Sequence, residues 1–553
     1  MALETDRRAL VAGALALPLV ATPALATPSF HPASDRIETG PASRVETSHG
    51  LVQGYRDAGV HVFKGIPYAG SPDGAGRFAR APALKAWSGV RNALNYGPIC
   101  PQLDRQGDLS GLEWPFLLPR GQATAILEDC LRINIWTRGL KGGRRPVMLW
   151  LHGQGFMGGS SQDFLATDGA NLARTQDVVV ASINHRVGPL GFMHLADLGQ
   201  APAEGGMAGM LDIVDALTWL KANAEGFGGD PGNITVFGES GGGFKTSVLL
   251  AMPEAEGLFH KAIIQSGARL RVQDRDGATA LARETLMALG LSAGDPLKLR
   301  DVPAQALLQA ADTAYRKIAA AEGKPASFYH PPRSWWMPVA ETPALPAQPW
   351  DPDAPALSAH IPLLVGTTLH EASPSMNDPS VESYGWAEVE ARLRGPLGDK
   401  ASDAVAAART AWPAEDPAGI LGVIEGRNFR LSAAELIARR LKAPAAPVYN
   451  YVLAWKTNAF DGRPRAFHTS DLVFMFANSD LVPQVSGGGV RGLRMAERMA
   501  GAWAAFARTG RPSHQNLPRW AASKPDRLET MVLDDNPELR RNPDAQLLRL
   551  LTD

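Results

Sequence analysis

One short stretch constrains the fold of this chain more than any other. Residues 234–237 are apolar and run directly into Gly238-Glu239-Ser240-Gly241-Gly242, and a second apolar stretch follows at 248–251. This places Gly-x-Ser-x-Gly at the turn between a buried strand and a helix. Glycines beside Ser240 relieve crowding in so tight a turn, which lifts the hydroxyl off the sheet and onto the end of the helix. Backbone N–H groups there can stabilise an oxyanion, so the stretch predicts a nucleophilic serine.

The rest of the chain supplies the sheet that such a turn needs. Segments 147–151 and 178–183 are uniformly apolar, as in strands covered on both faces. Helical spacing at 210–223 directly precedes the strand at 234–237, an order typical of a mostly parallel sheet. Further strands are predicted at 262–264, 361–365 and 448–452, and a small antiparallel edge at 44–98. We expect a single α/β domain over residues 27–553, with insertions.

Longer motifs carry a family resemblance. Residues 227–242 read FGGDPGNITVFGESGG, and residues 128–136 read EDCLRINIW. The stretches FKGIPYA (63–69), NHRVGPLGF (184–192) and WAAFARTGRP (503–512) belong to the same set. Together they resemble the type B carboxylesterase and cholinesterase-like family, including its bacterial para-nitrobenzyl-type esterases, over roughly residues 45–545. The resemblance implies the α/β-hydrolase fold, a large and mostly parallel central sheet flanked by helices.

A serine hydroxyl is a weak nucleophile until a base takes its proton and a third group orients that base. In α/β-hydrolases the acid and then the histidine follow the serine along the chain. The resemblance assigns the acid to Glu371, directly after the strand at 361–365, and the base to His468, after the strand at 448–452. Ala372 stands where the family usually has glycine. His370 is expected to be a bystander, since adjacent residues rarely point at the same partner.

The expected oxyanion hole departs from the family pattern at one position. Residues 152–156 read His-Gly-Gln-Gly-Phe, where the family would have glycine in place of Gln154. A backbone N–H survives this change, so the expected donors are Gln154, Gly155 and Gly241. Glycine reaches backbone angles that glutamine reaches only at a cost. Gln154 is therefore interpreted either as a donor or as a wall of the acyl pocket.

A small set of residues forms the candidate substrate pocket. An aromatic cluster with one arginine at 328–336 would suit an aromatic or anionic ester, although core packing under an insertion explains the same residues and is preferred. In the family, Glu239 looks like a supporting buried carboxylate. The candidates are Trp114, Phe156, Glu239, Arg333 and Trp336.

Charge and cysteine content exclude several kinds of partner. The chain has 55 Lys+Arg and 56 Asp+Glu, a net charge of -1. It shows no basic stripe, so nucleic acid is not an expected partner. Neither Cys100 nor Cys130 has a histidine or second cysteine at metal-ligand spacing. The sequence therefore predicts no metal and no organic cofactor, and it does not indicate an oligomeric state.

The first 26 residues are predicted to be an export signal peptide. Arg7 and Arg8 precede an apolar run, and a small-residue cleavage site ends at Ala26. The arginine pair favours twin-arginine export, with a Sec leader as the alternative, and the run is too short for a membrane anchor. We expect a periplasmic or secreted protein. An oxidising compartment would permit a disulfide between Cys100 and Cys130, the alternative being two buried free thiols.

These features together predict a serine carboxylesterase that hydrolyses small-molecule esters through an acyl-enzyme intermediate. An amidase, a carbamate hydrolase or a lactonase would use the same Ser-His-Glu residues and stays an alternative. A non-catalytic binding protein of the same fold is the rival from another class. The presence of Ser240, Glu371 and His468 together argues against that rival.

Overall fold

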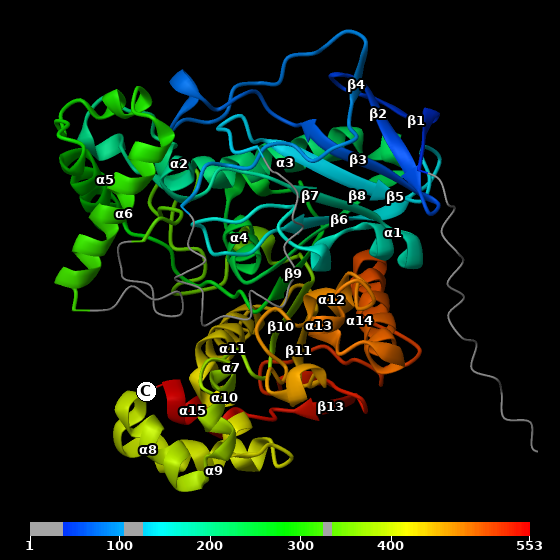
Figure 1. Cartoon of the computed structure of the whole chain (residues 1–553), viewed down its shortest axis with the longest axis vertical. Coiled ribbons are helices and arrows are strands. Elements are labelled where there is room, and N and C mark those ends of the chain that lie inside the picture. Colours follow the sequence, from blue (N-terminus) through cyan, green and yellow to red (C-terminus); the bar gives the residue numbers. More distant parts are fainter. Residues whose placement is uncertain (1–36, 104–124, 324–334, 553) are drawn as a thin grey trace, which may run out of the picture.

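The computed structural model of the chain describes residues 37–103, 125–323 and 335–552. The predicted signal peptide, Trp114 and Arg333 lie outside these ranges, so the predictions made for them stay predictions. A single large sheet runs through the molecule and helices cover both of its faces (Figure 1). Within the described ranges, no helix has the length and apolar character needed to cross a membrane.

The sheet joins 13 strands, of which β4 lies off the main path and pairs with β2. The order along the path is β1-β2-β3-β5-β7-β6-β8-β9-β10-β11-β12-β13. The strands are β1 (Glu38–Thr47), β2 (Gly50–Asp57), β3 (Val60–Pro67), β4 (Val90–Asn92), β5 (Arg132–Thr137), β6 (Arg145–Leu151), β7 (Val179–Ile183), β8 (Gly229–Glu239), β9 (Lys261–Gln265), β10 (Leu363–Thr368), β11 (Val448–Leu453), β12 (Glu529–Leu533) and β13 (Glu538–Arg541).

Strand direction divides the sheet into an antiparallel edge and a parallel centre. β1, β2, β3, β5 and β7 pair in antiparallel fashion, which confirms the edge predicted near the N-terminus. From β7 through β6, β8, β9, β10 and β11 to β12 every pairing is parallel. The predicted buried strands all lie in this parallel part or at its border. Because parallel strands end at the same edge of a sheet, their following loops gather there.

The helices connect these strands or pack onto the resulting layers. The predicted helix at 210–223 is confirmed as α3. The helices are α1 (Ala170–Gln176), α2 (Gly188–Phe192), α3 (Ala208–Asn223), α4 (Gly241–Leu249), α5 (Arg275–Ala288), α6 (Ala304–Ala321), α7 (Pro374–Asn377), α8 (Trp386–Leu397), α9 (Ala401–Ala411), α10 (Pro417–Glu425), α11 (Arg427–Leu441), α12 (Leu472–Met475), α13 (Pro483–Ser486), α14 (Gly489–Thr509) and α15 (Ala545–Thr552).

Alternate residues of each central strand enter different cores. Val147 and Leu149 of β6 belong to a core with buried residues of α3, α4 and α11. Met148 and Trp150 belong to a second core, which α12 and α14 cover from the opposite face (Figure 1). A third cluster joins α8, α9, α10 and α15 beside Leu369. Both faces of the sheet are therefore covered and shielded from water, as the uniformly apolar strands predicted.

The nucleophile turn depends on a very close approach between α4 and β6. A Cβ atom added at Gly242 would lie 1.9 Å from the carbonyl oxygen of Leu151, which is backbone and cannot move aside. A Cβ added at Gly238 would lie 2.4 Å from the carbonyl carbon of Gly242. Glycine at both positions lets the helix begin directly against the sheet.

We expect Gly242→Ala to destabilise the fold by about 3 kcal/mol or more, because the added methyl group would force α4 away from β6. The matched control is Gly294→Ala, where the added Cβ would meet only Ser292 Oγ at 3.6 Å. Melting temperatures of the two variants measure the difference. Equal melting temperatures would contradict the proposed close-packing requirement.

Candidate active site

Four loops that follow neighbouring parallel strands bring the predicted site together. Ser240 follows β8, Ser266 follows β9, Glu371 lies three residues after β10, and His468 lies in the loop after β11. Beyond the strand ends, the Glu371 and His468 loops still pair, since the N–H of His370 donates to the carbonyl of Ala466 at 3.1 Å. This contact places the side chains of the following residues next to each other.

Ser240 occupies the strained turn that its sequence pattern predicted. Its φ angle is +53°, a left-handed conformation that is costly for a residue with a side chain. Its N–H donates to the carbonyl of Gln265 at 2.9 Å, and its own carbonyl accepts from Phe244 N–H at 3.0 Å. Neighbouring strand and helix therefore hold the turn in place, and Ser240 stands at the N-cap of α4.

Glu371 orients His468 through a fully occupied carboxylate. One oxygen, Oε2, lies 2.5 Å from His468 Nδ1. The other, Oε1, accepts a hydrogen bond from Ser266 Oγ at 2.5 Å and one from the N–H of Thr368 at 2.8 Å. Because a carboxylate accepts and does not donate, the proton in the first contact resides on Nδ1. The other ring nitrogen, Nε2, then carries the lone pair.

The other ring nitrogen of His468 lies near a second carboxylate. His468 Nε2 lies 3.3 Å from Glu239 Oε1, and Glu239 is buried and adjacent to Ser240 in the chain. Among the described residues, no hydrogen bond joins Ser240 to His468. The lone pair of His468 is thus directed at Glu239, the residue before Ser240 in the chain.

The loop from His152 to Phe156 lies against the start of α4. A Cβ added at Gly241 would fall 2.2 Å from the backbone nitrogen of Gly155, so these two predicted donors are in direct contact. A Cβ added at Gly153 would lie 3.8 Å from Ser240 Cβ. The backbone of this loop and the start of α4 therefore lie next to each other beside Ser240. We call residues 152–156 the oxyanion loop.

Gln154 has a left-handed backbone conformation, of the kind that glycine adopts without strain. Its φ angle is +63°, and its side-chain Nε2 donates to Asp163 Oδ2 at 2.9 Å. The same Asp163 oxygen accepts the N–H of Ser160 at 2.7 Å. The side chain is therefore tied to the segment that follows the oxyanion loop, which offsets part of the backbone strain.

Two of the predicted pocket residues are core residues. Phe156 is 1% exposed, with its ring centroid 5.3 Å from that of Phe192 and 6.1 Å from that of Phe244. Trp336 is 2% exposed and belongs to the same core. For Trp336, this packing agrees with the preferred interpretation of the cluster at 328–336, which is core packing under an insertion. Glu239 is the one described candidate that contacts His468.

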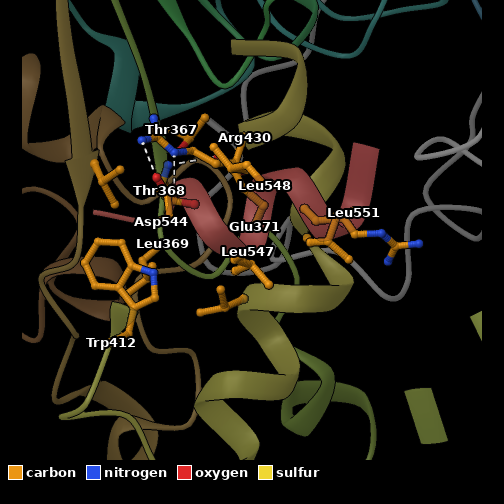
Figure 2. Close-up of a pocket in the computed structure, with 14 residues that line it drawn as sticks. Thr367, Thr368, Leu369, Glu371, Trp412, Arg430, Asp544, Leu547, Leu548 and Leu551 are labelled. Atoms are coloured by element: carbon orange, nitrogen blue, oxygen red, sulfur yellow. Dashed lines mark hydrogen bonds and ion pairs between the residues drawn. The ribbon is translucent and has the colours of Figure 1, made fainter. Parts of the chain in front are cut away.

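A small cavity of about 20 Å³ lies behind Glu371 (Figure 2). Glu371, Thr367 and Thr368 line it, together with apolar residues of α15. The Arg430 guanidinium in its wall makes hydrogen bonds of 2.7 and 3.1 Å to the two carboxylate oxygens of Asp544. A space of this size holds about one water molecule. It is too small for an ester and serves at most the hydration of the acid side of the site.

Sequence reasoning missed a buried carboxylate next to the site. Asp471 Oδ2 accepts from Gln265 Nε2 at 2.7 Å and from Tyr451 OH at 3.0 Å. Burial raises the pKa of Asp471 to about 6. Its position three residues after His468 was a usable signal. Ser266 was also missed, because a serine at the end of an apolar strand looks like an ordinary turn residue.

His370 is committed elsewhere, as predicted for a bystander. Its Nε2 lies 3.1 Å from Glu415 Oε2, and Lys456 Nζ lies 2.8 Å from the same oxygen. The pKa of Glu415 falls to about 2 because attraction and hydrogen bonding by His370 and Lys456 outweigh burial, the largest single effect.

The predicted disulfide is wrong for this structure, in which Cys100 and Cys130 are buried free thiols. The Cys100 thiol lies 3.5 Å from the Pro101 carbonyl oxygen. A hydrogen bond with Cys100 and then burial raise the pKa of Cys130 well above its ordinary value.

Comparison with known proteins identifies the family of the chain. The model of the carboxylesterase family matches residues 41–550. The para-nitrobenzyl esterase of Bacillus subtilis (strain 168) is 34% identical over 510 residues, covering 91% of this chain and 97% of the relative. The phenmedipham hydrolase of Pseudarthrobacter oxydans is 33% identical over 521 residues, covering 91% and 98%. A solved esterase of Clostridium hathewayi, described as able to hydrolyse aliphatic aromatic polyesters, superposes with a TM-score of 0.78. That esterase shares 31% identity, with 94% of this chain and 99% of its own covered.

The strand order, the strained serine turn and the loops at one sheet edge define an α/β-hydrolase. Within that class, the chain belongs to the carboxylesterase family and is a carboxylic ester hydrolase.

We expect Gln154→Gly to leave the relative rates on esters of different acyl length unchanged, because the Gln154 side chain is bonded to Asp163. The change removes backbone strain but also removes that hydrogen bond, so kcat should shift by less than about tenfold. A series of para-nitrophenyl esters of increasing acyl length measures both quantities. A marked gain in activity on longer acyl chains would show instead that the side chain walls the acyl pocket.

Between about pH 4 and pH 6, we expect the folding stability of Asp471→Asn to fall less with rising pH than that of the wild type. A raised native pKa means that the folded wild type holds a proton that the unfolded chain has released, so its stability falls as pH rises through this window. The asparagine variant should gain up to about 3 kcal/mol relative to wild type across it. Melting temperatures at several pH values test this, with exposed Asp526→Asn as the control. Parallel pH profiles for Asp471→Asn and wild type would contradict it.

Proposed function

We propose that this protein is a serine carboxylesterase in which Ser240 is the nucleophile, His468 the general base and Glu371 the acid. The observation that carries the proposal is the contact of 2.5 Å between His468 Nδ1 and Glu371 Oε2, beside the strained turn of Ser240. Glu371 keeps the Nδ1 proton in place, so the lone pair of His468 is on Nε2, where it would accept the proton of the serine hydroxyl.

In the first half of the reaction, Ser240 Oγ attacks the ester carbonyl while its proton moves to His468 Nε2. The imidazolium that forms is stabilised by Glu371, whose charge is itself held by Ser266 and the Thr368 N–H. His468 then protonates the leaving alkoxide, and the alcohol departs from the acyl-enzyme. Water, activated by the same histidine, hydrolyses the acyl-enzyme and restores the serine.

The negative oxygen of the tetrahedral intermediates would be bound by the N–H groups of Gly155, Gly241 and Gln154. Support comes from the direct backbone contact between Gly155 and Gly241, and from the left-handed φ angles of Gln154 and Gly155. Such preorganised donors contribute a large part of the rate enhancement in acyl transfer.

Glu239 has a supporting role in this scheme. Its Oε1 lies 3.3 Å from His468 Nε2, so it adds negative charge next to the ring nitrogen that receives the proton. That charge would favour the imidazolium during attack by the serine. In the substrate complex the serine hydroxyl would donate to Nε2, and contacts of this kind often tighten only when the substrate binds.

We expect Ser240→Ala to lower hydrolysis of a short para-nitrophenyl ester by at least about 10³-fold with little change in melting temperature, because the nucleophile is lost and the fold is kept. A fluorophosphonate probe should label the wild type on the peptide that contains Ser240 and should not label the variant. Ser292→Ala, at an exposed serine, is the control. Full activity of Ser240→Ala, or labelling at another serine, would refute the mechanism.

A further inference from the structure

A lysine is buried directly beneath the oxyanion loop. Lys245 lies in α4, five residues after Ser240, and its side chain is 0% exposed. Its Nζ donates to the carbonyl oxygen of His152 at 2.8 Å and to that of Gly153 at 3.4 Å. Within the described ranges it forms no ion pair. A lysine with this burial and no carboxylate partner is rare, because removing an ammonium group from water costs several kcal/mol.

Among the ionisable groups that surround Lys245, the lysine is the one that carries the positive charge. His152 and His185 stack with ring centroids 4.7 Å apart. Burial and then the charge of Lys245 hold the pKa of each well below its ordinary value, so both rings are neutral. In both, Nδ1 contacts a carbonyl oxygen and therefore carries the proton. Asp163 is the acidic group whose field opposes the desolvation of Lys245.

The two carbonyls that Lys245 binds belong to the peptide units of the oxyanion loop. The Gly153 carbonyl shares its peptide plane with the N–H of Gln154, and the His152 carbonyl shares its plane with the N–H of Gly153. A donor at the oxygen of a peptide unit polarises it and strengthens its N–H as a donor. The ammonium group also adds positive charge on the side of the loop opposite the substrate.

We propose that Lys245 is a positioning residue of the oxyanion hole, which fixes the peptide planes of residues 152–154 and strengthens the N–H of Gln154 toward the tetrahedral intermediate. The inference rests on the proposed function, since it takes Ser240 as the nucleophile. Asp163 holds the same loop from another side through the Gln154 amide. The loop is thus fixed by a cation on its carbonyls and an anion on its side chain.

The rival explanation is that Lys245 only supports the loop structurally, through its hydrogen bonds. The effect of the Lys245 charge distinguishes the two explanations. Burial lowers the pKa of Lys245 to about 7, so its charge is present below that pH and lost above it. If the charge assists the reaction, its benefit is largest in mildly acidic solution and fades in alkaline solution. Support through hydrogen bonds alone would be equally effective in mildly acidic and in alkaline solution.

The test compares Lys245→Met, which removes both charge and donors, with Lys245→Gln, which keeps donors without charge. We expect Lys245→Met to lower kcat on a para-nitrophenyl ester about tenfold or more at pH 6, with KM within about threefold. The inhibition constant of an aryl trifluoromethyl ketone, which forms an oxyanion on the serine, should rise by a similar factor. Lys245→Gln should restore only part of the loss, and the ratio of wild-type to Met-variant kcat should shrink as the pH rises to 9, because the charge is lost while the neutral amine still donates to the loop.

The control is Lys261→Met. That lysine is half-buried at the start of β9, the opposite end of the strands, and donates to Asn233 Oδ1. We expect its kcat to stay within about twofold of wild type. Should Lys245→Met fail to fold, as judged by its melting temperature, Lys245→Gln carries the pH comparison with wild type.

Several results would overturn the inference. These are an unchanged kcat in Lys245→Met, a rise in KM alone, full recovery in Lys245→Gln, or a ratio of kcat values that does not depend on pH. Any of them, found while Ser240→Ala is inactive, leaves the proposed function standing and removes only the role of Lys245. Full activity of Ser240→Ala would remove the proposed function itself.

Discussion

The contact of α4 with the end of β6 is the constraint on which the rest of the site depends. Gly242 brings the helix so close that an added Cβ would meet the Leu151 carbonyl at 1.9 Å. This approach forces the chain at Ser240 into a left-handed turn and aligns the first N–H groups of α4 with the oxyanion loop. The loop continues directly from β6, so the same contact sets the distance between Ser240 and the backbone N–H groups of that loop.

Around this contact, polar groups are buried in pairs that hold each other in place. Glu371 is occupied on both oxygens, by His468 on one side and by Ser266 and the Thr368 N–H on the other. The oxyanion loop is bound by Lys245 at its carbonyls and by Asp163 at Gln154. Buried polar groups of this kind are costly unless satisfied, and when satisfied they rigidify the structure. Rigid placement of donors is what an acyl-transfer site requires.

The substitution of glutamine at position 154 illustrates how one departure is absorbed. The backbone keeps the left-handed angle that glycine would adopt freely, at φ +63°. The strain is tolerated because the new side chain gains a hydrogen bond to Asp163. Lys245 supports the same loop from below, so two residues of this sequence contribute to one conformation. The local motif alone showed only that a glycine was missing.

Patterns along the chain were sufficient for the parallel strands, α3, the antiparallel edge and the serine turn, because apolar periodicity and glycine placement are local properties. Family resemblance then selected Glu371 and His468, which lie close together in the structure. The prediction for the two cysteines was wrong, since the compartment expected for a chain says nothing about the environment of each thiol. Ser266, Asp471 and Lys245 were not found, because their roles arise from contacts between distant segments.

The sequence by itself therefore determined the class of fold, and it predicted the nucleophilic serine and the order in which its partners follow. The tertiary structure decided which polar side chains surround them, since hydrogen bonds such as those from Ser266 to Glu371 and from Lys245 to His152 join residues about 100 positions apart. Burial decided the charge states as well, because it raises the pKa of Asp471 to about 6 and lowers that of Lys245 to about 7. Neither effect is visible until the sheet edge has assembled and water has been excluded from it.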